Sequence, residues 1–254
     1  MAKSNQWNRD ELLVTFRLYC QTPFGKLHQR NPEIIGLAEL LGRTPSAIAM
    51  KAVNFASLDP VQQARKIAGL RNASRADREL WEAFKQDSES IALEVEATYE
   101  SLSHQKIEIK EIERQVPKGS TETQRLVKVR RVQGFFRAAV LASYEFRCAL
   151  SDIAIPELLN ASHIIPWSID TNRRADPRNG IALNALYDRA FDRGLITFDE
   201  SLKLVLSSRL RKGKLPKFQN EFFLDLEGKK LRVPARFSPD PLALTYHREN
   251  IFVP

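Results

Sequence analysis

The pattern of apolar and polar residues predicts three short helices at the start of the chain. Apolar residues recur every three or four positions over residues 9–20, and Asn8 and Glu11 have the spacing of a capping box at the start of this helix. A second helix is expected over residues 32–41, before the stop signal Gly42, and a third over residues 45–55. The short segment LGRT joins the last two helices, so this block is predicted to form a helix-turn-helix-like unit.

Longer amphipathic helices are expected from residue 60 to about residue 113, where Gly69 is the internal breaker. These helices could pack on the first bundle, bridge two domains or pair two chains. The polar, turn-rich segment VPKGSTET then predicts a linker. The chain is therefore divided into a helical domain (residues 1–115), a linker (116–124) and a second domain (125–254).

The second domain is predicted to mix short strands and helices, which makes the whole chain α+β. Residues 158–165 have the composition of a short extended segment, and an Asn-Gly turn at 179–180 precedes a helix expected over residues 181–191. Alternating apolar residues in LITFDESLKLVLSSRL predict a hairpin with its turn at Asp199-Glu200. In the proline-rich tail, LDLEGKKLRVP predicts another short hairpin, and His247 is expected to be structural or to contact a phosphate.

Charge and cysteine content narrow the expected partners and compartment. A formal net charge of +8 favours a polyanionic partner, although charge alone does not separate DNA from RNA. The two cysteines, Cys20 and Cys148, have no metal-ligand cysteine or histidine at short spacing, which fits a reducing cytoplasm. No signal-peptide run is present, and no stretch approaches the roughly 18 apolar residues of a membrane span. We therefore expect a soluble, cytoplasmic protein without membrane association.

Several separated blocks of the second domain carry a family resemblance. They are RRVQGFFRAAVLASYEFRCALSD, ASHIIPW and NGIALNALYDRAFDRGLITFD, between about Arg130 and Asp199. This order of histidine, loop, Asn-Gly and helix resembles the HNH endonuclease family. The resemblance implies a ββα-metal domain, in which a hairpin carries a histidine that activates water and a helix carries side chains that hold one divalent cation. The expected ion is Mg²⁺, with Mn²⁺ as the alternative, and the expected substrate is double-stranded DNA.

His163 in ASHIIPW is the predicted general base, because a neutral imidazole can accept a proton from water at cellular pH. An isolated histidine on an apolar strand would more often be a buried core residue, but the surrounding blocks favour catalysis. Asn179 matches the middle asparagine of the motif, whose amide can tie the loop and orient the histidine. Its alternative interpretation is turn chemistry alone, since Asn-Gly is a common turn pair.

The position usually occupied by a histidine or asparagine on the helix falls on Tyr187, which is the main departure from the family. A neutral phenol is a poor ligand for a hard cation. Asp188 and Asp192 lie at i and i+4 on one helical face and could supply carboxylate oxygens instead. Asp192 is preferred because FDRG fits the family pattern, whereas Asp188 could be a solvated surface charge. Where relatives begin a Cys-x-x-Cys zinc pair at Cys148, the fourth position is a serine, so no structural zinc is expected.

Basic and polar side chains in three regions are candidate nucleic-acid contacts. They are Arg43, Lys51 and Asn54 in the helix-turn-helix-like unit, Arg131 and Arg137 in the helix expected before the motif, and Arg173, Arg174, Arg178, Arg189 and Arg193 in the motif itself. Arginine can grip phosphate with two hydrogen bonds and stabilise developing negative charge. The alternatives are a helical bundle used as scaffold or for protein contacts, and a charged face that is only solvated.

The favoured function is a metal-dependent DNA endonuclease, with restriction or defence as the expected role. A DNA-binding protein with a degenerate, inactive HNH domain is the first alternative, because of the tyrosine in the ligand position. An RNA-directed or nicking nuclease with the same chemistry is the second. A homodimer would provide the two sites that a double-strand break requires.

Overall fold

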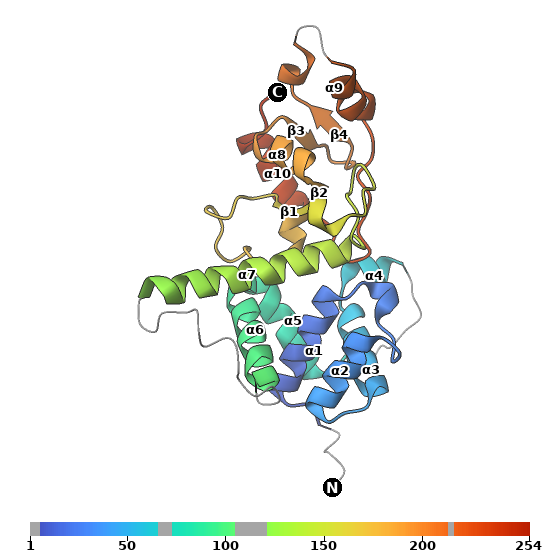
Figure 1. The fold of residues 1–254 in the computed structure, drawn as a ribbon, viewed down its shortest axis with the longest axis vertical. Coiled ribbons are helices and arrows are strands. Elements are labelled where there is room, and N and C mark those ends of the chain that lie inside the picture. Colours follow the sequence, from blue (N-terminus) through green and yellow to red (C-terminus); the bar gives the residue numbers. More distant parts are fainter. Residues whose placement is uncertain (1–5, 66–72, 105–120, 213–215) are drawn as a thin grey trace.

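The computed structural model describes residues 6–65, 73–104, 121–212 and 216–254. Two lobes lie on opposite sides of one long helix, α7 (Thr121–Ser143), which crosses the middle of the molecule (Figure 1). The helical lobe contains α1 (Arg9–Gln21), α2 (Pro32–Leu41), α3 (Pro45–Ala56), α4 (Pro60–Ala64), α5 (Arg75–Gln86) and α6 (Ser88–His104). The α+β lobe contains β1 (Leu159–His163), β2 (Gly180–Asn184), α8 (Ala185–Asp192), β3 (Ile196–Phe198), β4 (Leu204–Leu206), α9 (Lys217–Phe222) and α10 (Pro241–Asn250).

The first three helices form where their sequence signals predict them. Asn8 and Glu11 make a complete capping box at the start of α1, with Asn8 Oδ1 accepting from Glu11 N at 2.8 Å. Gly42 ends α2 in the left-handed conformation, with a φ of 61°. The hydroxyl of Thr44 caps α3 by accepting from Ala47 N at 3.2 Å. Local capping chemistry therefore fixes the bounds of these helices.

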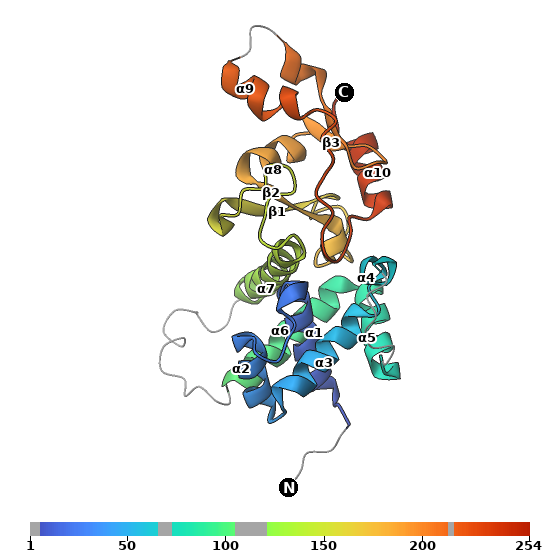
Figure 2. The ribbon, with the colours of Figure 1, turned by 90° about the vertical axis from the view of Figure 1, so that its right-hand side faces the viewer.

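Helix α7 belongs to the hydrophobic cores of both lobes. Phe135 and Ala139 are buried in the core of the helical lobe, whereas Phe136 and Val140 are buried in the core of the α+β lobe. Figure 2 shows α7 end-on, with one lobe on each side of it. Of the expected linker, residues 116–120 lie outside the described residues, and residues 121–124 form the first turn of α7.

The C-terminal part of the chain returns to the helical lobe. Phe237 stacks on Trp81, with ring centroids 5.8 Å apart, and its backbone N–H donates to Asp59 Oδ2 at 3.1 Å. The buried guanidinium of Arg236 donates hydrogen bonds to the carbonyl oxygens of Tyr19 and Cys20. Two residues of the α+β lobe thus complete the core of the other lobe.

The prediction of a hairpin in LDLEGKKLRVP is wrong. A short 3-10 helix, Leu224–Leu226, occupies the start of that segment, and Lys230 forms an antiparallel bridge with Lys203. The segment therefore pairs with the chain that enters β4 and not with itself. The hairpin expected around Asp199-Glu200 is confirmed as β3 and β4, with Ile196 opposite Leu206.

The centre of the α+β lobe is an antiparallel hairpin followed directly by a helix. β1 pairs with β2, and His163 lies opposite Gly180. A Cβ atom at Gly180 would lie 2.4 Å from Val140 Cγ2, so only glycine lets β2 approach α7 this closely. The helix expected from residue 181 begins at residue 185, because residues 181–184 pair with β1 and Asn184 caps α8 by accepting from Leu186 N and Tyr187 N. The predicted ββα order and α+β class are confirmed.

In the part of the chain that the structure describes, no helix combines the length and apolar character needed to cross a membrane.

The insertion of Phe237 gives a test of the shared core. We expect Phe237→Ala to lower the free energy of unfolding by about 3–5 kcal/mol, because a nearly fully buried aromatic side chain (3% exposed) is removed from contact with Trp81. Phe218→Ala is the matched control, since Phe218 is 61% exposed, and should change stability by no more than about 0.5 kcal/mol. Urea denaturation followed by fluorescence and circular dichroism measures both. Equal stability of the two variants would contradict this account.

Candidate active site

One pocket of about 420 Å³ brings together five of the candidate site residues of the motif. It lies between β1, α8 and the end of α10. Its lining includes the imidazole of His163, the carboxylates of Asp188 and Asp192, and the side chains of Arg189 and Arg193. A candidate base, two anionic oxygen donors and two cations therefore share one solvent-accessible hollow.

Aromatic rings hold the His163 imidazole on two sides. Phe136 of α7 stacks on it with ring centroids 3.7 Å apart and an angle of 13°, and Trp167 meets it edge-on at 5.7 Å. His163 Nε2 lies 3.1 Å from the carbonyl oxygen of Arg174. Because a carbonyl oxygen can only accept, Nε2 carries the hydrogen in the neutral ring and Nδ1 keeps the lone pair. The site thus selects the tautomer in which Nδ1 can act as a base.

Burial lowers the pKa of His163 below its ordinary value, because the charged imidazolium is poorly solvated between these rings. The hydrogen bond to the Arg174 carbonyl and the negative charge of Asp188 act in the opposite direction, while the positive charge of Arg174 lowers the pKa further. Burial is the largest of these effects. His163 is therefore neutral at cellular pH, which is the state that a general base requires.

The side chain of Asn179 ties the end of β1 to the start of β2. Its Oδ1 accepts from Ile165 N at 2.8 Å and its Nδ2 donates to Ile165 O at 3.1 Å. Its backbone carbonyl also accepts from Ile164 N at 2.9 Å. The side-chain amide thus does more than form a turn, because it binds the backbone two residues after His163 and holds the end of the strand that carries the histidine.

Asp188 is held against β1 and is not a solvated surface charge. Its two carboxylate oxygens accept from Asn160 Nδ2 at 2.7 Å and from the hydroxyl of Ser162. Asp192 lies one turn further along α8, at the rim of the same pocket. The pKa of Asp192 is raised by desolvation and then by the charge of Asp188. The sequence-based preference for Asp192 over Asp188 is thus not supported by their positions, because Asp188 is the one anchored beside His163.

Tyr187 does not reach the pocket, and its inclusion among the metal ligands is wrong. Its ring is 1% exposed and stacks on Phe222 with centroids 4.4 Å apart, and its hydroxyl donates to Phe222 O at 2.8 Å. Burial also raises the pKa of this phenol, which keeps it neutral. The side chain at this position packs α8 against α9, whereas the next residue, Asp188, points toward β1.

The donor set fits an ion that keeps much of its own water. Among the described residues, no three His, Cys, Asp or Glu side chains gather in a group that could hold a metal. Asp188 and Asp192 nevertheless share one pocket, and desolvation together with repulsion by Asp188 raises the pKa of Asp192. A cation placed between them would relieve that repulsion. Mg²⁺ is commonly bound by one or two carboxylates together with waters and substrate phosphate, so these residues fit it.

The predicted nucleic-acid contacts of the helical lobe are internal. Arg43 is 9% exposed and makes two hydrogen bonds to the carboxylate of Glu11. Lys51 is 8% exposed and pairs with Asp77 at 3.0 Å, and Asn54 is buried. The expectation that these three side chains face a DNA groove is wrong, because the turn before α3 is tied to α1 through Arg43, and α3 itself packs against α1 and α5.

Most predicted arginine contacts of the α+β lobe also have structural partners. These pairs are Arg131 with Glu100, Arg137 with the carbonyls of Leu159 and Pro156, Arg173 with Asp240, Arg174 with Glu89, and Arg178 with Asp176. Arg189 and Arg193 differ, since both are exposed on the pocket side of α8 and make no ion pair with any described residue. These two side chains are therefore the guanidinium groups that are free to meet a phosphate at the pocket.

His247 lines the same pocket but has a structural environment. It is buried, stacks on Phe191 at 3.7 Å, and its two ring nitrogens lie 2.9 Å from Thr197 Oγ1 and 3.2 Å from Phe191 O. Burial lowers the pKa of His247 to about 4. Both nitrogens are engaged, which agrees with the structural interpretation of this residue.

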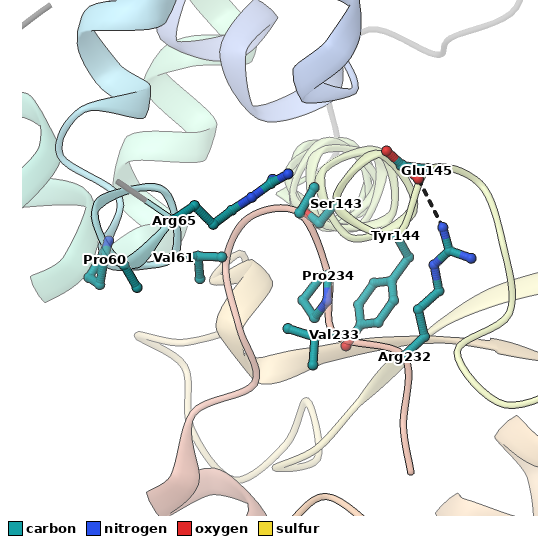
Figure 3. A pocket seen from close by; sticks show the side chains of 11 residues that line it. Pro60, Val61, Arg65, Ser143, Tyr144, Glu145, Arg232, Val233 and Pro234 are labelled. Carbon is teal, nitrogen blue, oxygen red and sulfur yellow. Dashed lines mark hydrogen bonds and ion pairs between the residues drawn. The ribbon is translucent and has the colours of Figure 1, made fainter. Parts of the chain in front are cut away.

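A second pocket, of about 720 Å³, lies where α4, the end of α7 and residues 232–235 meet (Figure 3). Tyr144 and Pro234 line it, and Arg232 at its edge pairs with Glu145 at 2.9 Å. None of the predicted site residues lines this pocket. The chemistry suggested by the motif is thus concentrated in the pocket of His163.

Comparison with known families agrees with this location. Residues 148–199 match the model of a family described as HNH endonuclease. The matched segment contains β1, β2, α8 and β3, and with them His163, Asn179 and both pocket carboxylates. Among curated proteins, no match to the chain was found. The resemblance to HNH endonucleases is confirmed for this segment.

The environment of His163 predicts its titration. We expect a midpoint below the usual value of about 6.5, with the hydrogen on Nε2 in the neutral ring. Asp188→Asn should lower the midpoint further, because it removes a carboxylate that favours the imidazolium. Nitrogen-15 NMR of labelled histidine in EDTA measures both, with the signal assigned by its loss in His163→Gln. A midpoint above 6.5, or a hydrogen on Nδ1, would contradict the proposed geometry.

Proposed function

We propose that this chain, which carries an HNH endonuclease domain over residues 148–199, is a metal-dependent endonuclease that hydrolyses phosphodiester bonds in double-stranded DNA. The observation that carries the proposal is the pocket that a neutral, Nε2-protonated His163 shares with Asp188 and Asp192 and with the exposed Arg189 and Arg193. The side chains that this proposal requires lie within one ββα unit.

His163 takes a proton from a water molecule through Nδ1, and the water oxygen then attacks phosphorus. One phosphorus–oxygen bond forms and the bond to the leaving sugar oxygen breaks, so the DNA strand is cut. Asn179 keeps the histidine backbone in place, and the Arg174 carbonyl keeps the hydrogen on Nε2. A positioned general base of this kind contributes about 10²- to 10⁴-fold to the rate.

Asp188 and Asp192 would hold the divalent ion, with Mg²⁺ the expected species and Mn²⁺ an alternative. When bound, the ion supplies electrostatic stabilisation of the charge that develops on the scissile phosphate. Ser162 and Asn160 orient Asp188 by donating to its two oxygens. The orientation of this carboxylate is thus set by β1, the same strand that carries His163.

Arg189 and Arg193 are the proposed phosphate contacts at the pocket, because arginine can donate two parallel hydrogen bonds to one phosphate. The net charge of +8 favours approach of any polyanion, so the distinction between DNA and RNA depends on a cleavage assay with both. A homodimer would bring two such pockets to one duplex. A role in restriction or defence would be supported by cleavage of foreign but not host DNA.

The competing proposal is a DNA-binding protein with a degenerate HNH domain. This alternative is based on the tyrosine at the expected ligand position. Tyr187, however, packs on Phe222, and Asp188 supplies a carboxylate to the pocket. A degenerate domain would bind DNA and leave it intact with Mg²⁺, Mn²⁺ or EDTA. Incubation of the purified chain with plasmid DNA under these three conditions separates the two proposals.

The general-base role is tested by His163→Ala. We expect cleavage to fall by about 10²- to 10⁴-fold while DNA binding is retained, because the substitution removes the proton acceptor and leaves the phosphate contacts. His28→Ala is the matched control, since His28 is exposed on the helical lobe, and should cleave as the parent does. A well-folded His163→Ala protein with near-parental cleavage would rule out the mechanism.

The ligand assignment is tested by isothermal calorimetry with Mg²⁺ or Mn²⁺ and by plasmid cleavage. We expect Asp188→Asn and Asp192→Asn each to weaken metal binding and cleavage together, because each removes an anionic oxygen that a hard cation requires. Tyr187→Phe is the contrasting variant and should keep metal affinity, losing about 0.5–1.5 kcal/mol of stability with its hydrogen bond to Phe222. Parental metal affinity in both aspartate variants would exclude these ligands.

A further inference from the structure

The β1–β2 loop, residues 164–179, is attached to the helical lobe as well as to its own. Ala175 is fully buried in the hydrophobic core of the helical lobe, and Trp167 packs against the same cluster. At the start of α6, the backbone N–H and the hydroxyl of Ser88 both donate to the carbonyl oxygen of Asn172, at 3.0 and 2.7 Å. Ser88 itself is only 1% exposed. The loop is thus fixed by apolar packing and by two shielded hydrogen bonds.

Arg174 connects this attachment to the candidate base. Its carbonyl oxygen accepts the hydrogen bond from His163 Nε2 at 3.1 Å. Its guanidinium donates to Trp167 O at 2.8 Å, lies over the Trp167 ring at 4.9 Å and reaches Glu89 Oε2 at 3.3 Å. The backbone atom that selects the histidine tautomer therefore belongs to a residue whose side chain is held by the second residue of α6.

We propose that Ser88 and Glu89 of the helical lobe are positioning residues for His163, because they fix the loop whose Arg174 carbonyl accepts the Nε2 hydrogen. The inference rests on the proposed role of His163 as general base. A base must present its lone pair at one place, and a misplacement of about 1 Å can cost about 10²-fold in rate. The helical lobe thus takes part in catalysis by holding the loop, without touching the reacting atoms.

Two variants remove the contacts separately. Ser88→Ala removes the hydroxyl that donates to Asn172 O, and Glu89→Gln removes the charge opposite Arg174. Glu94→Gln is the matched control, since Glu94 lies on the same helix and pairs with Arg9 at 2.7 Å, away from the loop. A contact that is only structural would change the stability of the protein and leave the imidazole of His163 as it is.

The first measurement is nitrogen-15 NMR of His163 at pH 8, without metal or DNA. We expect the parent and Glu94→Gln to hold the hydrogen on Nε2. Ser88→Ala and Glu89→Gln should give a mixture of tautomers and faster exchange of the imidazole hydrogen, because each leaves the loop that carries the acceptor carbonyl with one contact to α6 fewer. This measurement does not depend on nuclease activity.

The second measurement is plasmid cleavage. We expect kcat to fall by about 10- to 100-fold in both variants with KM for DNA unchanged, since the phosphate contacts are untouched. Folded Ser88→Ala and Glu89→Gln proteins with the parental tautomer would overturn the proposal. If Ser88→Ala does not fold, Glu89→Gln decides, because Glu89 is partly exposed. Absence of cleavage by the parent with every nucleic acid and ion would refute the proposed nuclease function, and the tautomer measurement would still decide the positioning role.

Discussion

Helix α7 must be covered on two sides, and the rest of the molecule is arranged around this requirement. Consecutive residues of an α-helix point about 100° apart, so Phe135 and Phe136 enter different lobes. Each is fully or almost fully buried. Removing either lobe would expose a continuous apolar face of α7 to water, which costs about 25 cal/mol for each Å² of apolar surface. The two lobes are therefore joined by a shared core rather than by a flexible connection.

The shared core also determines the surroundings of His163 in the candidate site. Phe136 packs in the core and also forms the wall on which His163 stacks, and Gly180 allows β2 to approach α7 beside it. The same burial that stabilises the fold lowers the pKa of His163 and keeps it neutral. On the other side of β1, hydrogen bonds from Asn160 and Ser162 orient Asp188. The hairpin and the helix that follows it thus place the imidazole of His163 and the carboxylate of Asp188 in the same pocket.

Local signals in the sequence were sufficient to predict the bounds of a helix where one residue determines them. The capping box at Asn8 and the left-handed glycine at Gly42 predicted helix bounds correctly. Signals that depend on distant partners were not sufficient. Lys51 was predicted to face DNA because helical periodicity identifies the polar face of a helix. It does not identify the element that covers that face, which here is α5 with Asp77. The start of α8 was missed because pairing with β1 overrode helical periodicity in residues 181–184, although Asn184 is itself a capping signal.

Arginine is the residue type whose partners in the structure differ most from those predicted from the sequence. Its five donors suit phosphate, but they suit backbone carbonyls and carboxylates equally well, and only the fold decides between them. Arg236 is fully buried and binds two carbonyls of α1, while Arg193 on α8 is exposed at the pocket. Because the lobes share α7 and the insertion of Phe237, they cannot move as independently tethered domains. The shared core therefore holds the helical lobe and the pocket of His163 in one fixed arrangement.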